Sequence, residues 1–311
     1  PPELGTDVFA MDTGNGSSTI PTYDSGFPVD FQFNRLVGSS ESWYTGARLI
    51  QKKHLFTDTT AAETSSSPAP NYTYDSNVGW GKTSDSSSVQ SWMWKRHAGF
   101  DVVTYTGIST SGSNGDPQVI PHSLGKIPEM MWVKDRDDNG DQWVIYHKGL
   151  DGGNNPATHY LYFTDAAEGD YTQFWNDTAP TSTHFTVGSH YGVNKQNDKY
   201  IAMLFASVDG ISKVGSYSGS DSTKNITDVG FQPRFLILKN ITTGGEGYNW
   251  YVFDTTRGWG SGADKALMLD DNAAQLTSTD YGAPTPTGFD LVGNKGGTND
   301  AGQTYIYYAH A

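Results

Sequence analysis

Asp101-Val102-Val103-Thr104-Tyr105-Thr106-Gly107 is a short strand-like run that ends in glycine, and related runs occur at residues 7–14 and 213–219. After each run the same landmarks follow in the same order. They are a proline before an apolar stretch (Pro28, Pro128, Pro233), a lone tryptophan (Trp43, Trp143, Trp250), an alanine pair beside acidic residues (Ala61-Ala62, Ala166-Ala167, Ala273-Ala274) and a Val-Gly step (Val78-Gly79, Val187-Gly188, Val292-Gly293). The chain is therefore predicted to be a triplicated domain with a period of about 100 residues, large enough for each unit to bury its own core.

We expect three domains, at residues 1–98, 99–209 and 210–311, of which the first departs most from the pattern. Short apolar runs between turn residues favour strands, and no stretch keeps a helical stripe for three turns. In the middle unit the predicted strands are residues 102–105, 118–120, 129–135, 142–147, 159–163, 184–187 and 200–206.

Seven strands in a unit of about 105 residues suit a small sandwich, because one sheet cannot cover both of its faces. The predicted fold class is all-β, with three tandem β-sandwich units of jelly-roll or immunoglobulin-like size. The alanine pairs are expected to form the only helical turn of each unit. The linkers at residues 95–101 and 207–213 are too short and apolar to be flexible tethers, which predicts a fixed array of units.

The composition excludes several classes of function. The net charge of -14 opposes a nucleic-acid partner, because phosphate binding depends on clustered lysine and arginine. The absence of cysteine excludes disulfides, thiolate catalysis and cysteine-based zinc sites. The longest apolar run, residues 200–208, is far shorter than a membrane span, so we expect no membrane insertion.

Several stretches together resemble a known family. They are residues 101–107, Ile120-Pro121-His122-Ser123-Leu124-Gly125-Lys126-Ile127-Pro128-Glu129-Met130, Trp143-Val144-Ile145-Tyr146-His147-Lys148, and residues 175–183, 200–206, 231–233, 253–258 and 305–307. The chain resembles repeat domains of tail-fibre-like and other virion structural proteins of marine bacteriophages. The likeness covers the second and third units end to end and the first only loosely.

This resemblance implies a protein on the virion surface, outside the cell, that is a host-contacting fibre or a decoration protein. Its implied partners are a host cell-surface glycan or receptor and other virion subunits. Tail fibres are commonly trimers, so the resemblance also implies a homo-oligomer such as a trimer. It brings no catalytic residues.

Aromatic residues in the predicted loops are the first candidates for binding. Trp175, Tyr191, Trp259 and Tyr281 lie beside Asn, Asp and Gly. A flat ring offered to solvent can stack on a sugar while Asn176 and Asp177 hydrogen-bond its hydroxyls. The alternative is a ring folded over its own loop or buried at a junction.

A second candidate is a calcium loop at residues 135–141. Asp135, Asp137, Asn139 and Asp141 place oxygen ligands at alternate positions, as a calcium loop does. Position twelve of that loop would be Tyr146, which supplies no carboxylate. The favoured alternative is a polar β-hairpin with Asn139-Gly140 in its turn, so calcium remains a possible cofactor only.

No catalytic motif is present, and the predicted function is non-enzymatic: host or glycan attachment by a virion surface protein. One alternative is a purely architectural capsid-decoration or filament subunit. A second is a polysaccharide depolymerase, because acids such as Asp165, Glu168, Asp170, Asp177, Asp254, Asp270 and Asp271 are abundant. A depolymerase would require a deep acidic groove with two facing carboxylates.

Overall fold

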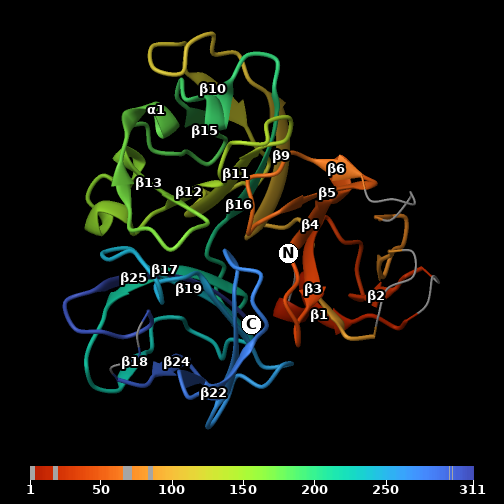
Figure 1. The fold of residues 1–311 in the computed structure, drawn as a ribbon, viewed down its shortest axis with the longest axis vertical. Helices are drawn as coiled ribbons and strands as arrows, with labels where there is room; N and C mark the ends of the chain where they lie inside the picture. The colour runs from red at the N-terminus through yellow and green to blue at the C-terminus, as the bar shows by residue number, and fades with distance from the viewer. Residues whose placement is uncertain (1–3, 17–19, 66–71, 83–86, 294, 296) are drawn as a thin grey trace.

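The computed structural model describes residues 4–16, 20–65, 72–82, 87–293, 295 and 297–311, and over these residues the chain is all-β. Figure 1 shows three lobes around a common centre: the first part of the chain in red and orange, the middle in green and the last in blue. Each lobe holds one six-stranded antiparallel sheet and one small sheet. The prediction of three tandem β-sandwich units is confirmed.

The large sheets have the same strand order in each lobe, which we call unit 1, unit 2 and unit 3. In unit 1 the order is β1 (Phe9–Thr13), β8 (Val89–Trp94), β3 (Phe31–Leu36), β4 (Tyr44–Ala47), β5 (Lys53–Phe56) and β6 (Thr64–Ser65). In unit 2 it is β9 (Phe100–Thr106), β16 (Lys199–Phe205), β11 (Met130–Asp135), β12 (Val144–His147), β13 (His159–Tyr162) and β14 (Gly169–Asp170). In unit 3 it is β17 (Ser212–Ser218), β25 (Thr304–His310), β19 (Phe235–Asn240), β20 (Tyr251–Asp254), β21 (Asp264–Met268) and β22 (Leu276–Thr279).

The small sheets and short helices complete the units. The small sheets are β2 (Tyr23–Asp24) with β7 (Gly79–Trp80), β10 (Gln118–Pro121) with β15 (His184–Val187), and β18 (Lys224–Ile226) with β24 (Gly288–Leu291) and β23 (Gly282–Thr285). The helices are η1 (Gly5–Asp7), η2 (Arg48–Ile50), η3 (Leu150–Gly153), η4 (Pro156–Thr158), α1 (Thr172–Trp175) and α2 (Tyr191–Asn194). None of the described helices is long and apolar enough to cross a membrane.

The strand predictions for the middle unit agree with the structure. Each of the seven predicted strands has a counterpart among β9, β10, β11, β12, β13, β15 and β16. Sequence patterns miss β14, which has only two residues. The expectation of a helical turn at the alanine pairs is wrong, because they lie in irregular segments and the helical turns occur elsewhere.

The central strands are buried on both faces, and this decides how the units assemble. In β11 all six residues are buried, and alternate side chains enter two different cores. Trp132 packs in a core shared by all three units, whereas Met131 and Val133 pack in a core that belongs to unit 2 alone. Units 1 and 3 have private cores of the same kind beneath their small sheets.

Aromatic rings join the units within the shared core. Phe31 of unit 1 lies 6.2 Å from Trp132 of unit 2, measured between ring centroids. Phe205 of unit 2 lies 4.9 Å from Tyr308 of unit 3. Phe9 of unit 1 lies 5.1 Å from Phe235 of unit 3, so every pair of units is in contact. The expectation that each unit buries its own core is therefore incomplete, because one apolar face of every large sheet is covered by the other two units.

The two ends of the described chain meet where units 1 and 3 join. A Cβ added to Gly5 would lie 2.6 Å from the carbonyl oxygen of Ala311. Arg234 donates from Nη2 to the carbonyls of Ala311, at 2.9 Å, and Phe9, at 3.2 Å. These contacts close the arrangement of three units into a ring.

We predict that unit 2, expressed alone as residues 99–209, does not form a soluble folded monomer, whereas the whole chain unfolds in one cooperative transition. Removing the neighbours exposes one apolar face of its large sheet, including Trp132, Ile201 and Phe205. Circular dichroism, calorimetry and size-exclusion chromatography provide the test. Three separate thermal transitions in the whole chain, or a folded monomeric unit 2, would contradict the shared core.

Candidate functional site

Three tryptophans link the units in a cycle. Trp43, Trp143 and Trp250 each directly precede the fourth strand of a large sheet and are fully buried. Their Nε1 atoms donate to the carbonyls of Met268 at 2.7 Å, Phe56 at 2.6 Å and Tyr162 at 2.9 Å. Each acceptor is the last residue of the fifth strand in a neighbouring unit. The bonds therefore run from unit 1 to unit 3, from unit 3 to unit 2 and from unit 2 to unit 1, around a pseudo-threefold axis.

Three buried cations repeat the same cycle. Arg35, Lys134 and Lys239 are the fifth residues of β3, β11 and β19, and all three are buried. Arg35 donates to the carbonyl of Asn272 at 3.0 Å, Lys134 to that of Thr60 at 3.3 Å and Lys239 to that of Asp165 at 3.4 Å. Burial lowers the pKa of Arg35 to about 10 and that of Lys239 to about 8, so both remain largely protonated at neutral pH.

A main-chain hydrogen bond reinforces each of these junctions. The amides of Glu63, Glu168 and Gln275 donate to carbonyls one unit away, at distances of 2.8, 3.0 and 2.9 Å. These acceptors belong to Arg136, Ile241 and Val37, two residues beyond the three buried cations. The segment that contains each alanine pair is thus held against the next unit, and the acids beside the pair lie near the axis.

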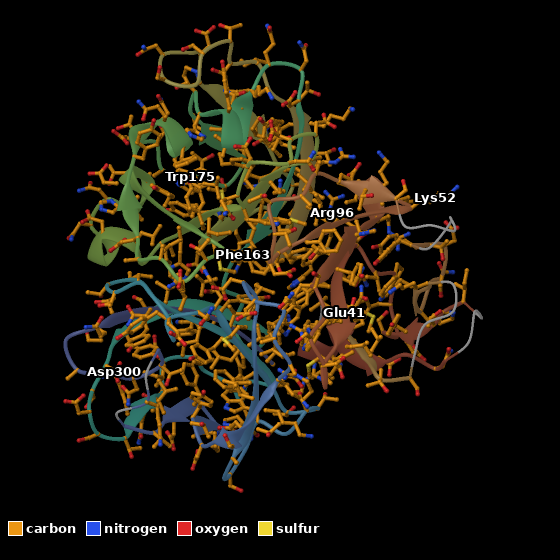
Figure 2. All side chains as sticks on the ribbon, in the orientation of Figure 1. Glu41, Lys52, Arg96, Phe163, Trp175 and Asp300 are labelled. Carbon is orange, nitrogen blue, oxygen red and sulfur yellow. The ribbon has the colours of Figure 1, made fainter. Side chains whose placement is uncertain are left out.

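The three segments line an open pocket of about 350 Å³, which we call the axial pocket. Its walls come from all three units: Asp58, Thr59 and Thr60; Gln142, Phe163, Thr164 and Asp165; and Asn249, Asp270 and Asp271. Figure 2 places Phe163 near the centre of the molecule, where the lobes meet. The ring of Phe163 lies 5.7 Å from that of Trp143 and 5.2 Å from that of Trp250, so it joins the pocket to the tryptophan cycle.

Some of the lining carboxylates already accept hydrogen bonds from the main chain. Asp58 accepts from the Trp43 amide at 2.9 Å, and Asp270 accepts from the Trp250 amide at the same distance. In contrast, the side chains of Gln142 and Asp165 have no hydrogen-bond partner among the described residues. The pocket therefore combines structural carboxylates with groups that remain available to a ligand.

Asp270 is the lining residue with the strongest shift in acidity. Burial raises its pKa from 3.8 to about 6, although hydrogen bonds from Trp250 and Asn249 and the charge of Lys239 act in the opposite direction. This carboxylate is ionised at neutral pH and becomes protonated in mildly acidic solution.

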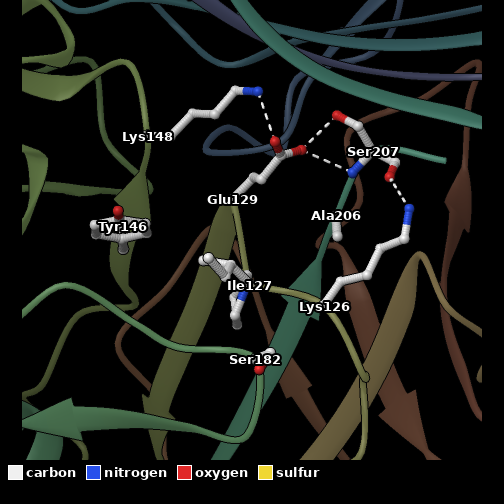
Figure 3. A pocket seen from close by; sticks show the side chains of 9 residues that line it. Lys126, Ile127, Glu129, Tyr146, Lys148, Ser182, Ala206 and Ser207 are labelled. Carbon is white, nitrogen blue, oxygen red and sulfur yellow. Dashed lines mark hydrogen bonds and ion pairs between the residues drawn. The ribbon is translucent and has the colours of Figure 1, made fainter.

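A second cavity, of about 520 Å³, lies beside the linker between units 2 and 3 (Figure 3). Its apolar wall includes Ile127, Tyr146 and Ala206. At its polar edge Glu129 accepts from Lys148 at 2.7 Å and from the Ser207 amide at 2.7 Å. The Ser207 hydroxyl also donates to Glu129.

The serine and carboxylate at this second cavity belong to a repeated structural anchor. Asp30 occupies the position of Glu129 in unit 1, directly before the central strand. It pairs with Arg48 at 3.1 Å and accepts from the Arg96 amide at 2.8 Å, as Glu129 does with Lys148 and Ser207. Because the arrangement recurs at the start of each linker, we interpret it as holding the linker, and it gives no support for a serine nucleophile.

The structure contradicts the exposure expected of three predicted binding rings. Trp175 is 1% exposed and packs in the private core of unit 2, where its Nε1 donates to the carbonyl of His159 at 3.0 Å. Trp259 and Tyr281 are 4% and 6% exposed. Both pack against Phe253 in the core of unit 3. Apolar neighbours from the same unit cover each ring, so none can stack on a sugar.

The other residues of the aromatic hypothesis do lie at the surface. Tyr191 is 39% exposed at the start of α2, and its hydroxyl donates to the carbonyl of Thr110 at 3.2 Å. Asn176 and Asp177 are exposed and have positive φ angles of 53° and 47°. The structure therefore separates these polar groups from the buried ring of Trp175 that they were expected to assist.

Side-chain oxygens in the loop at residues 135–141 accept hydrogen bonds from main-chain amides. Asp135 accepts from the amides of Asp137 and Asp138, and Asn139 accepts from the amide of Ala62 in unit 1. No group of three or more acidic or histidine side chains in the described part of the chain is arranged to hold a metal ion. Strands β11 and β12 do form the favoured antiparallel hairpin, although its connection is longer than a two-residue turn.

A lysine ammonium occupies the interior of this loop. Lys134 Nζ lies 2.7 Å from the carbonyl oxygen of Asp135 and 3.5 Å from that of Asp138. Asp141 is half-buried nearby, and burial raises the pKa of its carboxyl. The loop that resembles a calcium site is therefore closed around a cation that the chain itself supplies.

Sequence patterns identify the axial pocket only in part. Asp165, Asp270 and Asp271 belong to the pool of acids considered for a catalytic pair, but Asp58, Gln142 and the other lining residues are missed. The available signal is repetition: each unit places acids beside its alanine pair and a polar residue directly before its lone tryptophan.

Replacing Lys134 by methionine is expected to lower the free energy of unfolding by about 1–3 kcal/mol, because the carbonyls of Thr60 and Asp135 lose a buried donor. Lys199→Met is the matched control, since the Lys199 side chain is 61% exposed and lies 3.7 Å from Asp137. Urea denaturation of both variants measures the difference. Equal effects would show that the buried ammonium does not stabilise the junction.

Replacing Asp270 by asparagine is expected to change how stability depends on pH. Because the pKa of Asp270 is higher in the folded than in the unfolded protein, protonation of Asp270 stabilises the folded state. This stabilisation is lost as the pH rises from about 4 to about 6. The stability of Asp270→Asn relative to the wild type should therefore increase over this range, by at most about 1.4 kcal/mol per pH unit. Denaturation curves at pH 4, 5, 6 and 7 test this, with exposed Asp177→Asn as control. A difference that does not change with pH would contradict the shift.

Comparison with models of known protein families identifies the family of this chain. The model of a family described as a domain of unknown function, DUF7483, matches residues 9–311. No curated protein matches the chain in a sequence search. A single family model thus spans all three units and the shared core between them. The chain belongs to the DUF7483 family.

Proposed function

We propose that this chain is a non-enzymatic attachment module of a virion surface protein, of tail-fibre or appendage type, which holds a glycan on the host surface. The observation that carries the proposal is the axial pocket, a polar cavity built jointly by three units that share one core. The resemblance of units 2 and 3 to virion repeat domains supplies the biological setting. The proposed partners are a host glycan or receptor and other virion subunits.

The position of the pocket suits an attachment role. Arg35, near the end of β3, contacts the segment that lines the pocket in unit 3. Arg234, directly before β19, contacts the carbonyl of Ala311. The pocket and the two ends of the described chain therefore lie at opposite ends of the central strands. A module held at its termini would present the pocket outward.

A polysaccharide depolymerase is the second candidate, and one observation favours it. The axial pocket gathers Asp58, Asp165, Asp270 and Asp271, and Asp270 has a pKa of about 6, which suits a general acid. Attachment is favoured because Asp58 and Asp270 repeat the same bond to a tryptophan amide, a structural role. Release of reducing ends from bacterial polysaccharides, abolished in Asp270→Asn, would reverse this preference.

The attachment proposal predicts that the fluorescently labelled chain binds a defined group of glycans on an array and binds cells of selected marine bacteria. Periodate oxidation of the cell surface, which destroys sugar diols, should abolish cell binding. Light scattering of the same preparation measures its oligomeric state. An array without signal, together with open-ended polymerisation, would overturn attachment and favour an architectural subunit.

A further inference from the structure

We propose that the axial pocket binds a single terminal sugar residue that is uncharged or carries an amine, and that it rejects acidic sugars. This inference rests on the proposed attachment function and names its site and ligand class. The pocket is distinct from the loop aromatics that sequence patterns favour, because it is built from the segments beside the three alanine pairs.

The volume of the pocket limits the ligand to one small ring. Ligand pockets in proteins measure about 300–1,000 Å³, and the axial pocket, at about 350 Å³, lies near the lower limit. An oligosaccharide could place only its end residue inside. The remainder of the chain would lie outside on the surface around the axis.

The lining suits hydroxyl groups. Five neutral hydrogen-bonding side chains, three threonines with Gln142 and Asn249, face the cavity from all three units. Among the described residues the Gln142 amide has no protein partner, so it offers both a donor and an acceptor to a ligand. Sites built to hydrogen-bond a hydroxyl discriminate strongly against ligands that lack it. Phe163 supplies the only aromatic ring among the lining residues.

The charge of the pocket determines which sugars it accepts. Four aspartates line it, and Asp165 has no hydrogen-bond partner for its carboxylate among the described residues. The nearby cations Arg35 and Lys239 donate to main-chain carbonyls and lie buried beneath the loops. Each cation interacts with two of the carboxylates, Arg35 with Asp58 and Asp271, and Lys239 with Asp165 and Asp270. Four carboxylates against two cations leave the pocket with an excess of negative charge. An anionic sugar would therefore be repelled, whereas an amine could pair with Asp165.

The test uses three sugars that share one ring: glucosamine, glucose and glucuronate. Saturation-transfer NMR on the whole chain at pH 7 should rank their affinities in that order, with no signal for glucuronate. Gln142→Ala should weaken binding of both glucosamine and glucose about tenfold, the effect of one lost hydrogen bond. Asp165→Asn should remove the preference for glucosamine and leave glucose unchanged.

The variants and controls separate the possible failures. Gln142 makes no side-chain hydrogen bond within the described structure, so Gln142→Ala should keep the wild-type melting temperature. Asp165→Asn removes a charge that interacts with Lys239, so its melting temperature is measured beside its sugar binding. Gln196→Ala, at an exposed position of unit 2, is the matched control and should bind as the wild type does. Any of three results would overturn the axial site. Glucuronate could bind as well as glucose does, the pocket could bind calcium but no sugar, or sugar binding could be unaffected by Gln142→Ala.

The two proposals fail in different ways. Glycan-array binding that persists in Gln142→Ala would leave attachment standing and place the glycan elsewhere. Loss of array binding, cell binding and all three NMR signals in the wild type would overturn both.

Discussion

The structure depends on one constraint: the large sheet of each unit is buried on both faces. Strands β8, β11 and β19 send apolar side chains into both a private core and the shared core. The small sheet of a unit covers only the private face. The other face must be covered by a neighbour, and three units in a ring satisfy this requirement for one another. In this ring the hydrophobic effect acts between units as it does within them.

The polar contacts between units follow from the same arrangement. Once the sheets close around a shared core, the tryptophan before each fourth strand reaches a carbonyl of the adjacent unit, and the cation in each central strand reaches the next loop. Each contact joins a buried donor to a main-chain carbonyl of the adjacent unit, and the buried donor would be costly to leave unpaired. Such bonds set the angle between units more narrowly than apolar packing can. The same bonds bring the acidic segments of the three units together at the axis, where they form the axial pocket.

Much of the fold could be predicted from sequence because its signals are local. Repeated glycines, prolines and tryptophans indicate three units, and alternation and turn residues give the strands of unit 2. The shared core could not be predicted, because a strand buried between two cores has the same apolar pattern as one buried inside a single sandwich. Trp259 illustrates the limit: its glycine-rich loop indicates exposure, but the loop folds its ring onto Phe253. The axial pocket could not be predicted for a related reason. Its residues are far apart in the sequence and meet only when three units assemble.

The central claim is that the three units form one cooperative body, and native-state hydrogen exchange tests it most directly. The amides of β8, β16 and β25, which occupy the same place in the three large sheets, should exchange with the same free energy of opening, equal to that of global unfolding. Distinct opening energies, one for each unit, would show that the units unfold separately and that the shared core does not bind them into a single structure.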